Sequence, residues 1–261
     1  MKVRANGIEI GYLVEGEGPW LTMSHSLACN LHMWDEQAAV LARHFRVLRF
    51  NTRGHGDSDA PKGAYTLEAL ADDLKGLLDA LGVKETHFVG LSLGGMIGQT
   101  FALKYPGILK TLVLADTTSR YPAEAASVWA ERIKVAETQG MEPLVQPTLE
   151  RWLTEAYRGA NPGRTKQIGD MIRTTPVAGY AGCSHAIPKI NLTARLREVG
   201  VPGLVIVGEQ DMGTPVAMAR EIHDNYPGSE LVIIPSAAHL ANLEQPEAFN
   251  SALADFLAKH R

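Results

Sequence analysis

The serine at position 92 stands in a sequence context that is typical of an enzymatic nucleophile. Residues 90–94 read Gly-Leu-Ser-Leu-Gly, with the apolar pair Phe88-Val89 before them and a helical pattern after them. A sharp turn from a strand into a helix exposes the serine at its tip and strains its backbone. Side chains two positions before or after the serine would collide in such a turn, and glycine removes them. We therefore predict that Ser92 is a nucleophile, and we expect Gly95 to let the following helix pack close to the strand.

A serine hydroxyl becomes a strong nucleophile only when a base takes its proton, and that base needs an acid to orient it. When the serine stands on such a turn in a parallel sheet, the acid and then the base follow it in the chain, each after a strand. Asp211 follows the apolar run 203–207, and His239 follows the apolar run 231–234. The sequence therefore predicts a triad of Ser92, Asp211 and His239.

Asp116 is the alternative acid, because it ends the strand expected at residues 112–115. The other histidines precede the nucleophile, lie in the helical stretch described below, or lie on a helical surface or at the tail. None of them has the position in the chain order that His239 has.

Attack by a serine on a carbonyl produces a negative oxygen, which backbone N–H groups can stabilise. The N–H of Leu93 follows the nucleophile at the positive end of a helix. The second N–H should come from the loop Ser24-His25-Ser26-Leu27, which follows an earlier strand. We predict that the N–H groups of Leu27 and Leu93 form this oxyanion hole, and both side chains could also line the pocket.

Strands alternate with helices along most of the chain. Asn6-Gly7 predicts a tight hairpin, and Thr66 and Gly82 can begin and end a helix through residues 67–81. Apolar runs predict strands at residues 3–4, 8–12, 20–24, 45–50, 88–89, 112–115, 203–207 and 231–234. Helical spacing predicts further helices at residues 34–44, 215–226 and 246–258. Such alternation, with several strands apolar throughout, favours a mostly parallel eight-stranded sheet covered by helices on both faces.

Residues 120–189 interrupt this alternation, because no strand is evident there. The pattern instead predicts helices around residues 123–139, 141–157 and 163–174. We expect a core made of residues 1–119 and 190–261, with residues 120–189 inserted as a helical cap.

Composition restricts the classes of partner. The 261 residues are 45% hydrophobic and 21% charged, with a net charge of −4 and no long run of Lys or Arg. This argues against nucleic acid and against an anionic membrane surface. Two distant cysteines, no export signal and no long apolar run suggest a cytoplasmic protein that does not span a membrane.

Two further sequence patterns bear on cofactors. Residues 51–58, Asn-Thr-Arg-Gly-His-Gly-Asp-Ser, lack the lysine of a phosphate-binding loop, so we interpret them as a structural turn. No motif has metal-ligand spacing. We therefore expect neither a cofactor nor a metal.

Taken together, these residues resemble the α/β-hydrolases, and among them the 3-oxoadipate enol-lactonases and related small esterases. The resemblance covers nearly the whole chain. It is closest at Ser26-Leu27, Met33-Trp34, residues 52–56, Ala60-Pro61, residues 90–98 and His239. It implies an α/β-hydrolase fold with an inserted helical cap, and the family's triad falls on Ser92, Asp211 and His239.

The chain departs from these lactonases at a few positions near the expected site. The lactonases tend to have Asn-Ser-Leu-Gly-Thr where residues 25–29 read His-Ser-Leu-Ala-Cys. They favour Asp at the position of Asn51 and Asn at the position of Asp116. Ala28 in place of glycine beside the oxyanion hole changes the floor of the pocket.

The resulting expectation is a cofactor-free serine hydrolase that opens a small carboxylic ester or lactone through an acyl-enzyme, with a 3-oxoadipate enol-lactone as a candidate substrate. A general carboxylesterase, a C–C bond hydrolase or a cofactor-free perhydrolase would use the same triad. From a different class, the fold also serves ligand receptors.

A lactone of this kind carries a carboxylate, which a cation must pair when the cap covers it. The candidate cations in the cap are Arg120, Arg132, Lys134 and Arg173. Arg120 is preferred, because the chain leaves the sheet for the cap there, and Trp129 is a candidate for the pocket wall.

Overall fold

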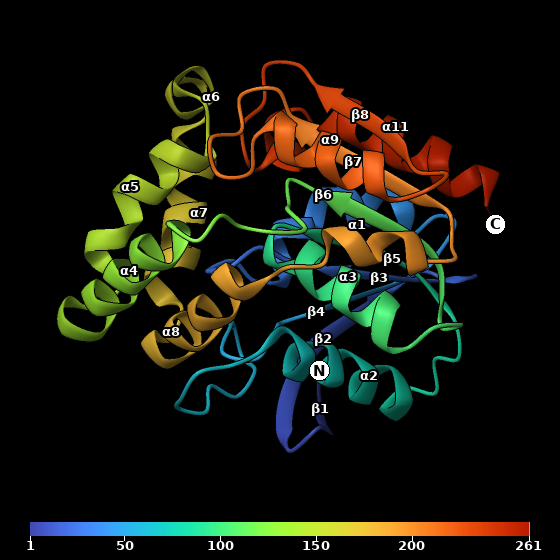
Figure 1. Ribbon diagram of the computed structural model, residues 1–261, viewed down its shortest axis with the longest axis horizontal. Helices are drawn as coiled ribbons and strands as arrows, with labels where there is room; N and C mark the ends of the chain where they lie inside the picture. Colours follow the sequence, from blue (N-terminus) through green and yellow to red (C-terminus); the bar gives the residue numbers. More distant parts are fainter. Residues whose placement is uncertain (261) are drawn as a thin grey trace.

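The order of the strands explains why distant parts of the sequence meet at one edge. Within residues 1–260, which the computed structural model describes, eight strands form one sheet in the order β1-β2-β4-β3-β5-β6-β7-β8 (Figure 1). β1 and β2 form the predicted hairpin and β2 runs antiparallel to β4, whereas all other neighbouring pairs are parallel. The strands are β1 (Lys2–Ala5), β2 (Ile8–Glu15), β3 (Trp20–Ser24), β4 (Arg46–Phe50), β5 (Thr86–Leu91), β6 (Leu109–Ala115), β7 (Gly203–Gly208) and β8 (Glu230–Ile234). The predicted mostly parallel eight-stranded sheet is confirmed.

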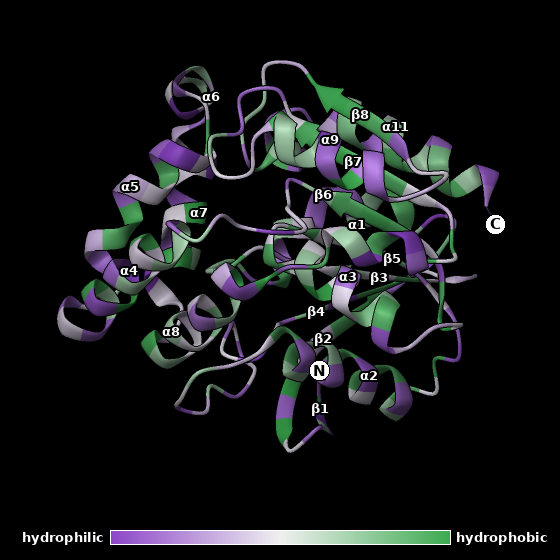
Figure 2. Ribbon diagram, in the orientation of Figure 1, coloured by the Kyte–Doolittle hydropathy of each residue, from purple (hydrophilic) through white to green (hydrophobic). Residues whose placement is uncertain are grey.

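Helices cover both faces of the sheet. α2 and α3 pack together and α9 lies beside β7 on one face, while α1 and α11 pack together on the other (Figure 1). These and the short helices of the same region are η1 (Leu31–Trp34), α1 (Asp35–Leu41), α2 (Leu67–Ala80), α3 (Leu93–Lys104), η3 (Thr193–Glu198), α9 (Val216–Asn225), α10 (Ala241–Glu244) and α11 (Pro246–Lys259). β5 and β7 are buried along their whole length. Figure 2 accordingly shows the central strands in the green of apolar residues.

Local signals set the bounds of α2 as the sequence predicts. The Thr66 hydroxyl accepts a hydrogen bond from the Ala69 N–H at 3.1 Å and caps the helix. Gly82 follows its end with a φ of +69°, in the left-handed region that favours glycine. The leucines at helical spacing face the core.

Residues between β6 and β7 form a helical segment that lies to one side of the sheet (Figure 1). It contains α4 (Ala125–Gln139), α5 (Glu142–Trp152), α6 (Glu155–Ala160), α7 (Pro162–Thr174), α8 (Val177–Ala186) and η2 (Ile187–Lys189). The helix predicted at residues 141–157 is two helices, because Thr154 has extended backbone and its side chain caps α6. No strand lies between β6 and β7 in the described part of the chain.

The prediction of three helices in this segment missed α8. That helix has no polar stripe, because residues 179–184 are all buried. A Cβ on Gly179 would stand 1.9 Å from the carbonyl oxygen of Gly54, so α8 packs backbone to backbone against the turn at residues 51–58. A helix that is buried over most of its length and carries few polar residues lacks the amphipathic pattern on which such a prediction depends.

The two ends of the helical segment are joined where the chain leaves and rejoins the sheet. Arg120 and Asn191 form an isolated antiparallel bridge. The Leu192 N–H donates to the Ser119 carbonyl at 2.7 Å, and the hydroxyls of Ser119 and Thr193 are 2.7 Å apart. Hydrogen bonds therefore hold the two ends of the segment together where it joins the sheet. No helix within residues 1–260 is long and apolar enough to cross a membrane.

Candidate active site

Ser92 stands at the tip of a strained turn between β5 and α3. Its φ is 56° and its ψ is −115°, a combination that L-residues rarely adopt. A Cβ on Gly90 would lie 2.2 Å from the Gly94 carbonyl oxygen, and one on Gly94 would lie 2.3 Å from the Ser24 carbonyl oxygen. As the sequence predicts, both positions require glycine, Gly90 because of a contact within the turn and Gly94 because of a contact with the end of β3.

The expectation for Gly95 is wrong in its detail. A Cβ there would meet the side chain of Thr117, which follows β6, at 2.7 Å. The close approach of α3 to the strands occurs instead at Gly98, where a Cβ would lie 2.6 Å from the Phe88 ring. One helical turn separates the two contacts, so the sequence pattern alone did not distinguish them.

Asp211 and His239 are brought together by the loops after β7 and β8. Asp211 Oδ2 lies 2.8 Å from His239 Nδ1 and also accepts a hydrogen bond from the Thr214 hydroxyl at 2.7 Å. Asp211 Oδ1 accepts from the N–H groups of Gly213 and Thr214 at 2.7 and 3.0 Å. Burial alone would raise the pKa of the Asp211 carboxyl, but His239 and the bonds from Thr214 outweigh it and hold that pKa below its ordinary value. The pair is an ionised carboxylate that orients an imidazole.

Asp116 has a different environment, although it ends the adjacent strand β6. Its Oδ1 accepts from the Gly208 N–H at 2.8 Å, and no hydrogen bond joins it to His239 within residues 1–260. Burial, and then the charge of Asp211, raise its pKa well above the ordinary value. Asp116 therefore links β6 to β7, whereas Asp211 contacts the imidazole.

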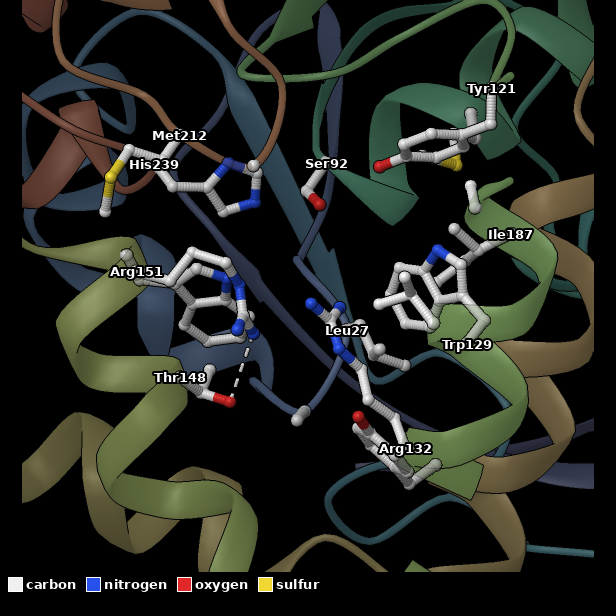
Figure 3. Close-up of a pocket in the computed structure, with 17 residues that line it drawn as sticks. Leu27, Ser92, Tyr121, Trp129, Arg132, Thr148, Arg151, Ile187, Met212 and His239 are labelled. Carbon is white, nitrogen blue, oxygen red and sulfur yellow. Dashed lines mark hydrogen bonds between the residues drawn. The ribbon is translucent and has the colours of Figure 1, made fainter. Parts of the chain in front are cut away.

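Ser92 and His239 line one pocket of about 180 Å³ between the sheet edge and the helical segment. Figure 3 shows the side chains of Ser92 and His239 facing this space. Trp129 and Arg132 extend toward it from α4, and Arg151 extends toward it from α5. The lining residues also include Leu27, Ala28, Met96, Tyr121, Ala125, Val128, Thr148, Trp152, Tyr180, Ile187, Met212 and Gly213. No hydrogen bond joins Ser92 to His239 within the described residues, a looseness that is common in active sites without substrate.

The helical segment contacts the loop that carries His239. The Trp152 ring stacks on the imidazole with centroids 5.7 Å apart, and the Trp152 carbonyl accepts from the Leu240 N–H at 3.2 Å. Glu244, which is buried, accepts from the Ala238 N–H at 2.7 Å through one oxygen. Its other oxygen accepts from the Thr154 N–H and hydroxyl at 2.9 and 2.7 Å. The position of His239 is thus tied to the end of α5.

The two backbone N–H groups predicted to form an oxyanion hole are available for a ligand. Within residues 1–260 neither the Leu27 N–H nor the Leu93 N–H donates a hydrogen bond. Leu93 begins α3 directly after Ser92, and Leu27 lies in a turn closed by the Cys29 N–H and the Ser26 carbonyl at 3.2 Å. Free N–H groups beside a serine are an arrangement that can stabilise a negative oxygen.

The structure corrects the expectation that Arg120 lines the pocket. Its side chain is 58% exposed and pairs with Glu221 of α9 at 2.5 Å. The bridge to Asn191 fixes its backbone at the junction, and Arg120 is not among the residues that line the pocket beside Ser92. Lys134 and Arg173 are also exposed and paired with carboxylates on the surface.

Two other arginines line the pocket instead. Arg132 lies over the Trp129 ring, 4.7 Å from its centroid, and Trp129 itself lines the pocket as expected. Arg151 donates to the Thr148 hydroxyl at 3.3 Å, and its pKa is lowered to about 10 by burial and then by the charge of Arg132. Neither arginine has a carboxylate partner within residues 1–260.

The sequence analysis did not identify Arg151. Helical spacing is a signal that could have identified Arg151. This residue stands three positions after Thr148, on the face of α5 that buries Thr148 and Trp152. A cation on the inner face of an inserted helix is a candidate for pairing a buried anion.

Comparison with known proteins identifies the fold family. The family described as the alpha/beta hydrolase fold matches residues 19–246. The chain belongs to this family. Among curated relatives, this α/β-hydrolase is 32% identical to 3-oxoadipate enol-lactonase 2 of Acinetobacter baylyi, over 95% of this chain and 93% of that protein.

Two solved structures superpose closely on this α/β-hydrolase. The enol-lactonase from Burkholderia xenovorans LB400 is 37% identical, with a TM-score of 0.96, and the match covers 99% of this chain and 100% of that one. A thermophilic esterase from Thermogutta terrifontis is 30% identical, with a TM-score of 0.96 over 100% of both chains. The predicted resemblance to enol-lactonases within the α/β-hydrolases is confirmed.

Proposed function

We propose that this α/β-hydrolase is a serine hydrolase that cleaves a small carboxylic ester or lactone bearing a carboxylate. The observation that carries the proposal is one pocket lined by Ser92, by the His239 that Asp211 orients, and by two arginines that have no carboxylate partner among residues 1–260. Relatives named as enol-lactonases and as an esterase support the reaction class.

The proposed reaction proceeds through an acyl-enzyme. Ser92 Oγ attacks the substrate carbonyl as His239 Nε2 takes the hydroxyl proton, since Nδ1 of that ring is bonded to Asp211. The N–H groups of Leu27 and Leu93 stabilise the oxyanion of the tetrahedral intermediate. Collapse of the intermediate breaks the ester C–O bond, and His239 gives its proton to the leaving oxygen. In the second half of the reaction, His239 takes a proton from water as the water attacks the acyl-enzyme carbonyl. Collapse of this intermediate releases the acid, and His239 returns the proton to the Ser92 oxygen.

Arg132 and Arg151 are proposed to bind the substrate carboxylate. Arg151 is partly buried and close enough to Arg132 for that charge to lower its pKa to about 10, after the larger effect of burial. An anion bound between two such groups would relieve their mutual repulsion and form charge-assisted hydrogen bonds. A pocket of about 180 Å³ suits a small acyl group. An enol-lactone of the 3-oxoadipate type combines a lactone with a carboxylate and is the proposed substrate.

We also propose that residues 120–189 act as a cap over a core of residues 1–119 and 190–261. α4 and α5 provide both arginines together with Trp129 and Trp152, so the cap would determine which substrate binds. Cys29 and Cys183 are free thiols, which suits the cytoplasm proposed from the sequence.

The nucleophile is tested with Ser92→Ala. We expect this variant to fold normally and to lose about 10⁵- to 10⁶-fold in kcat, the scale for removal of a triad nucleophile. A fluorophosphonate should label the wild type on Ser92, as read by peptide mass spectrometry. A label on Ser26 or Ser236 would refute the assignment.

The substrate class is tested with Arg151→Met, which keeps much of the side-chain volume and removes the charge. We expect KM for the anionic lactone to rise about tenfold or more, because one charge-assisted contact is lost. Turnover of neutral p-nitrophenyl acetate should be nearly unchanged. Arg120→Ala is the matched control and should affect neither substrate, since Arg120 is exposed and paired with Glu221. Equal effects of Arg151→Met on both substrates would favour a general esterase.

A further inference from the structure

The turn at residues 51–58 takes no part in the proposed chemistry, yet it contacts the loop that carries Leu27. His55 Nε2 accepts a hydrogen bond from the Ala28 N–H at 2.9 Å. His25 Nε2 accepts one from the Thr52 N–H at 3.0 Å. Each of the two segments, the Leu27 loop and the turn at residues 51–58, therefore donates one backbone N–H to a histidine of the other.

These bonds determine the tautomer of each histidine. A backbone N–H can only donate, so both Nε2 atoms must be unprotonated acceptors. The Nδ1 atoms then carry the hydrogens. His55 Nδ1 donates to the Arg53 carbonyl at 3.1 Å, and His25 Nδ1 donates to the Ser26 carbonyl at 2.7 Å. The two rings are fully buried with centroids 5.1 Å apart. Burial lowers the pKa of His55 to about 4, which keeps the acceptor free of a proton near neutral pH.

Ala28 is the residue that needs such support. Its φ is 57°, in the left-handed region that costs alanine more than glycine. It follows Leu27 within the turn closed by the Cys29 N–H and the Ser26 carbonyl. The Ala28 N–H that His55 accepts belongs to the peptide group joining Leu27 to Ala28. The hydrogen bond to His55 therefore fixes the orientation of that peptide plane, which adjoins Leu27.

We propose that His55 is a positioning residue for the oxyanion hole. By holding the Ala28 N–H it keeps Ala28 at positive φ and thereby aims the Leu27 N–H into the pocket beside Ser92. This inference rests on the proposed function, because it assigns the Leu27 N–H to the oxyanion.

The conservative variant His55→Gln tests the acceptor directly. A glutamine Oε1 can reach the place of the imidazole Nε2, whereas His55→Leu removes the acceptor. We expect His55→Leu to lower kcat for p-nitrophenyl acetate about tenfold to a hundredfold with little change in KM, since a misplaced oxyanion donor weakens only the transition state. His55→Gln should keep most of the wild-type kcat. The inhibition constant of an alkyl boronic acid, which forms a tetrahedral adduct with serine, should rise in parallel with the loss of kcat.

Ala28→Gly in the His55→Leu background is the rescue variant. Glycine adopts positive φ without strain, so it should restore a large part of the lost kcat. His87→Leu is the control for loss of a buried imidazole elsewhere, because His87 bonds to Thr111 on the neighbouring strand, and it should leave kcat unchanged. Equal losses in His55→Leu and His55→Gln, or no rescue by glycine, would overturn the proposal. If His55→Leu fails to fold, amide hydrogen exchange at Ala28 in the wild type decides the question, because slow exchange supports the bond to His55 and fast exchange overturns the proposal.

A measurement without substrate separates this inference from the proposed function. Amide hydrogen exchange at Ala28 should be slow in the wild type and in His55→Gln, and fast in His55→Leu when that variant folds. Fast exchange at Ala28 in the wild type would overturn the positioning role. Failure of the wild type to hydrolyse esters or lactones, with slow exchange at Ala28, would refute the proposed function alone.

Discussion

The pKa values of two buried aspartates, Asp116 and Asp211, shift in opposite directions because their partners differ. Asp211 accepts several hydrogen bonds and contacts the imidazole, whereas Asp116 accepts one from the Gly208 N–H and has a raised pKa. The sequence left both open as the acid, since each follows a strand. The hydrogen bonds favour Asp211.

We therefore predict that Asp211→Asn lowers kcat by about 10³- to 10⁴-fold, because the imidazole then takes the wrong tautomer. Asp116→Asn should cost far less, since no hydrogen bond joins Asp116 to His239 within residues 1–260 and asparagine can still accept from the Gly208 N–H. Steady-state kinetics of the two purified variants on p-nitrophenyl acetate would check this. The reverse ranking would place the acid on β6.

At the scale of elements, the helical segment and the His239 loop share one buried carboxylate. Glu244 of α10 accepts hydrogen bonds from the Ala238 N–H and from the N–H and hydroxyl of Thr154. Thr154 lies between α5 and α6. Trp152 of α5 stacks on the imidazole. Movement of α5 would therefore move groups that contact His239.

We predict that Glu244→Gln lowers the free energy of unfolding by about 1–3 kcal/mol, because its amide N–H₂ would face a donor that is buried. It should also lower kcat/KM, since the ring of His239 would lose part of its support. Urea denaturation and ester kinetics would measure both effects. Glu247→Gln on the exposed start of α11 is the matched control, and a similar result for the two variants would contradict the role of Glu244.

At the scale of the whole molecule, buried neutral histidines link folding to pH. The pKa of His55 is lowered to about 4 and that of His25 to about 3, in both cases mainly by burial. An unfolded chain would protonate them near 6.5. Between these values the unfolded state binds more protons than the folded state, so acid favours unfolding.

We predict that the wild type loses stability relative to His55→Gln as the pH falls from about 6.5 to about 4, by up to about 1.4 kcal/mol per pH unit. Glutamine does not titrate, so the difference between the two proteins isolates the histidine. Above pH 7 the difference should be constant. Chemical denaturation at several pH values would measure it, and a difference that does not change with pH would show that His55 is not buried in its neutral form.

The sequence by itself determined the features that depend on local sterics and periodicity. Glycines at residues 90 and 94 predicted the strained turn at Ser92, since only glycine avoids the backbone there. Apolar runs and helical spacing predicted the eight strands and helices such as α2, because each pattern arises from one element facing the core. The order of strands then placed Asp211 and His239 on neighbouring loops.

Only the tertiary structure decided where side chains of the helical segment point. The place of Arg120 in the chain predicted it as the cation, but Arg120 pairs with Glu221 on the surface, and Arg132 and Arg151 line the pocket instead. The sequence did not predict α8, because a helix that is buried over most of its length shows no amphipathic periodicity. The bond from Ala28 to His55 joins residues 27 positions apart in the chain. Such contacts depend on how separate elements pack, which local sequence patterns do not encode.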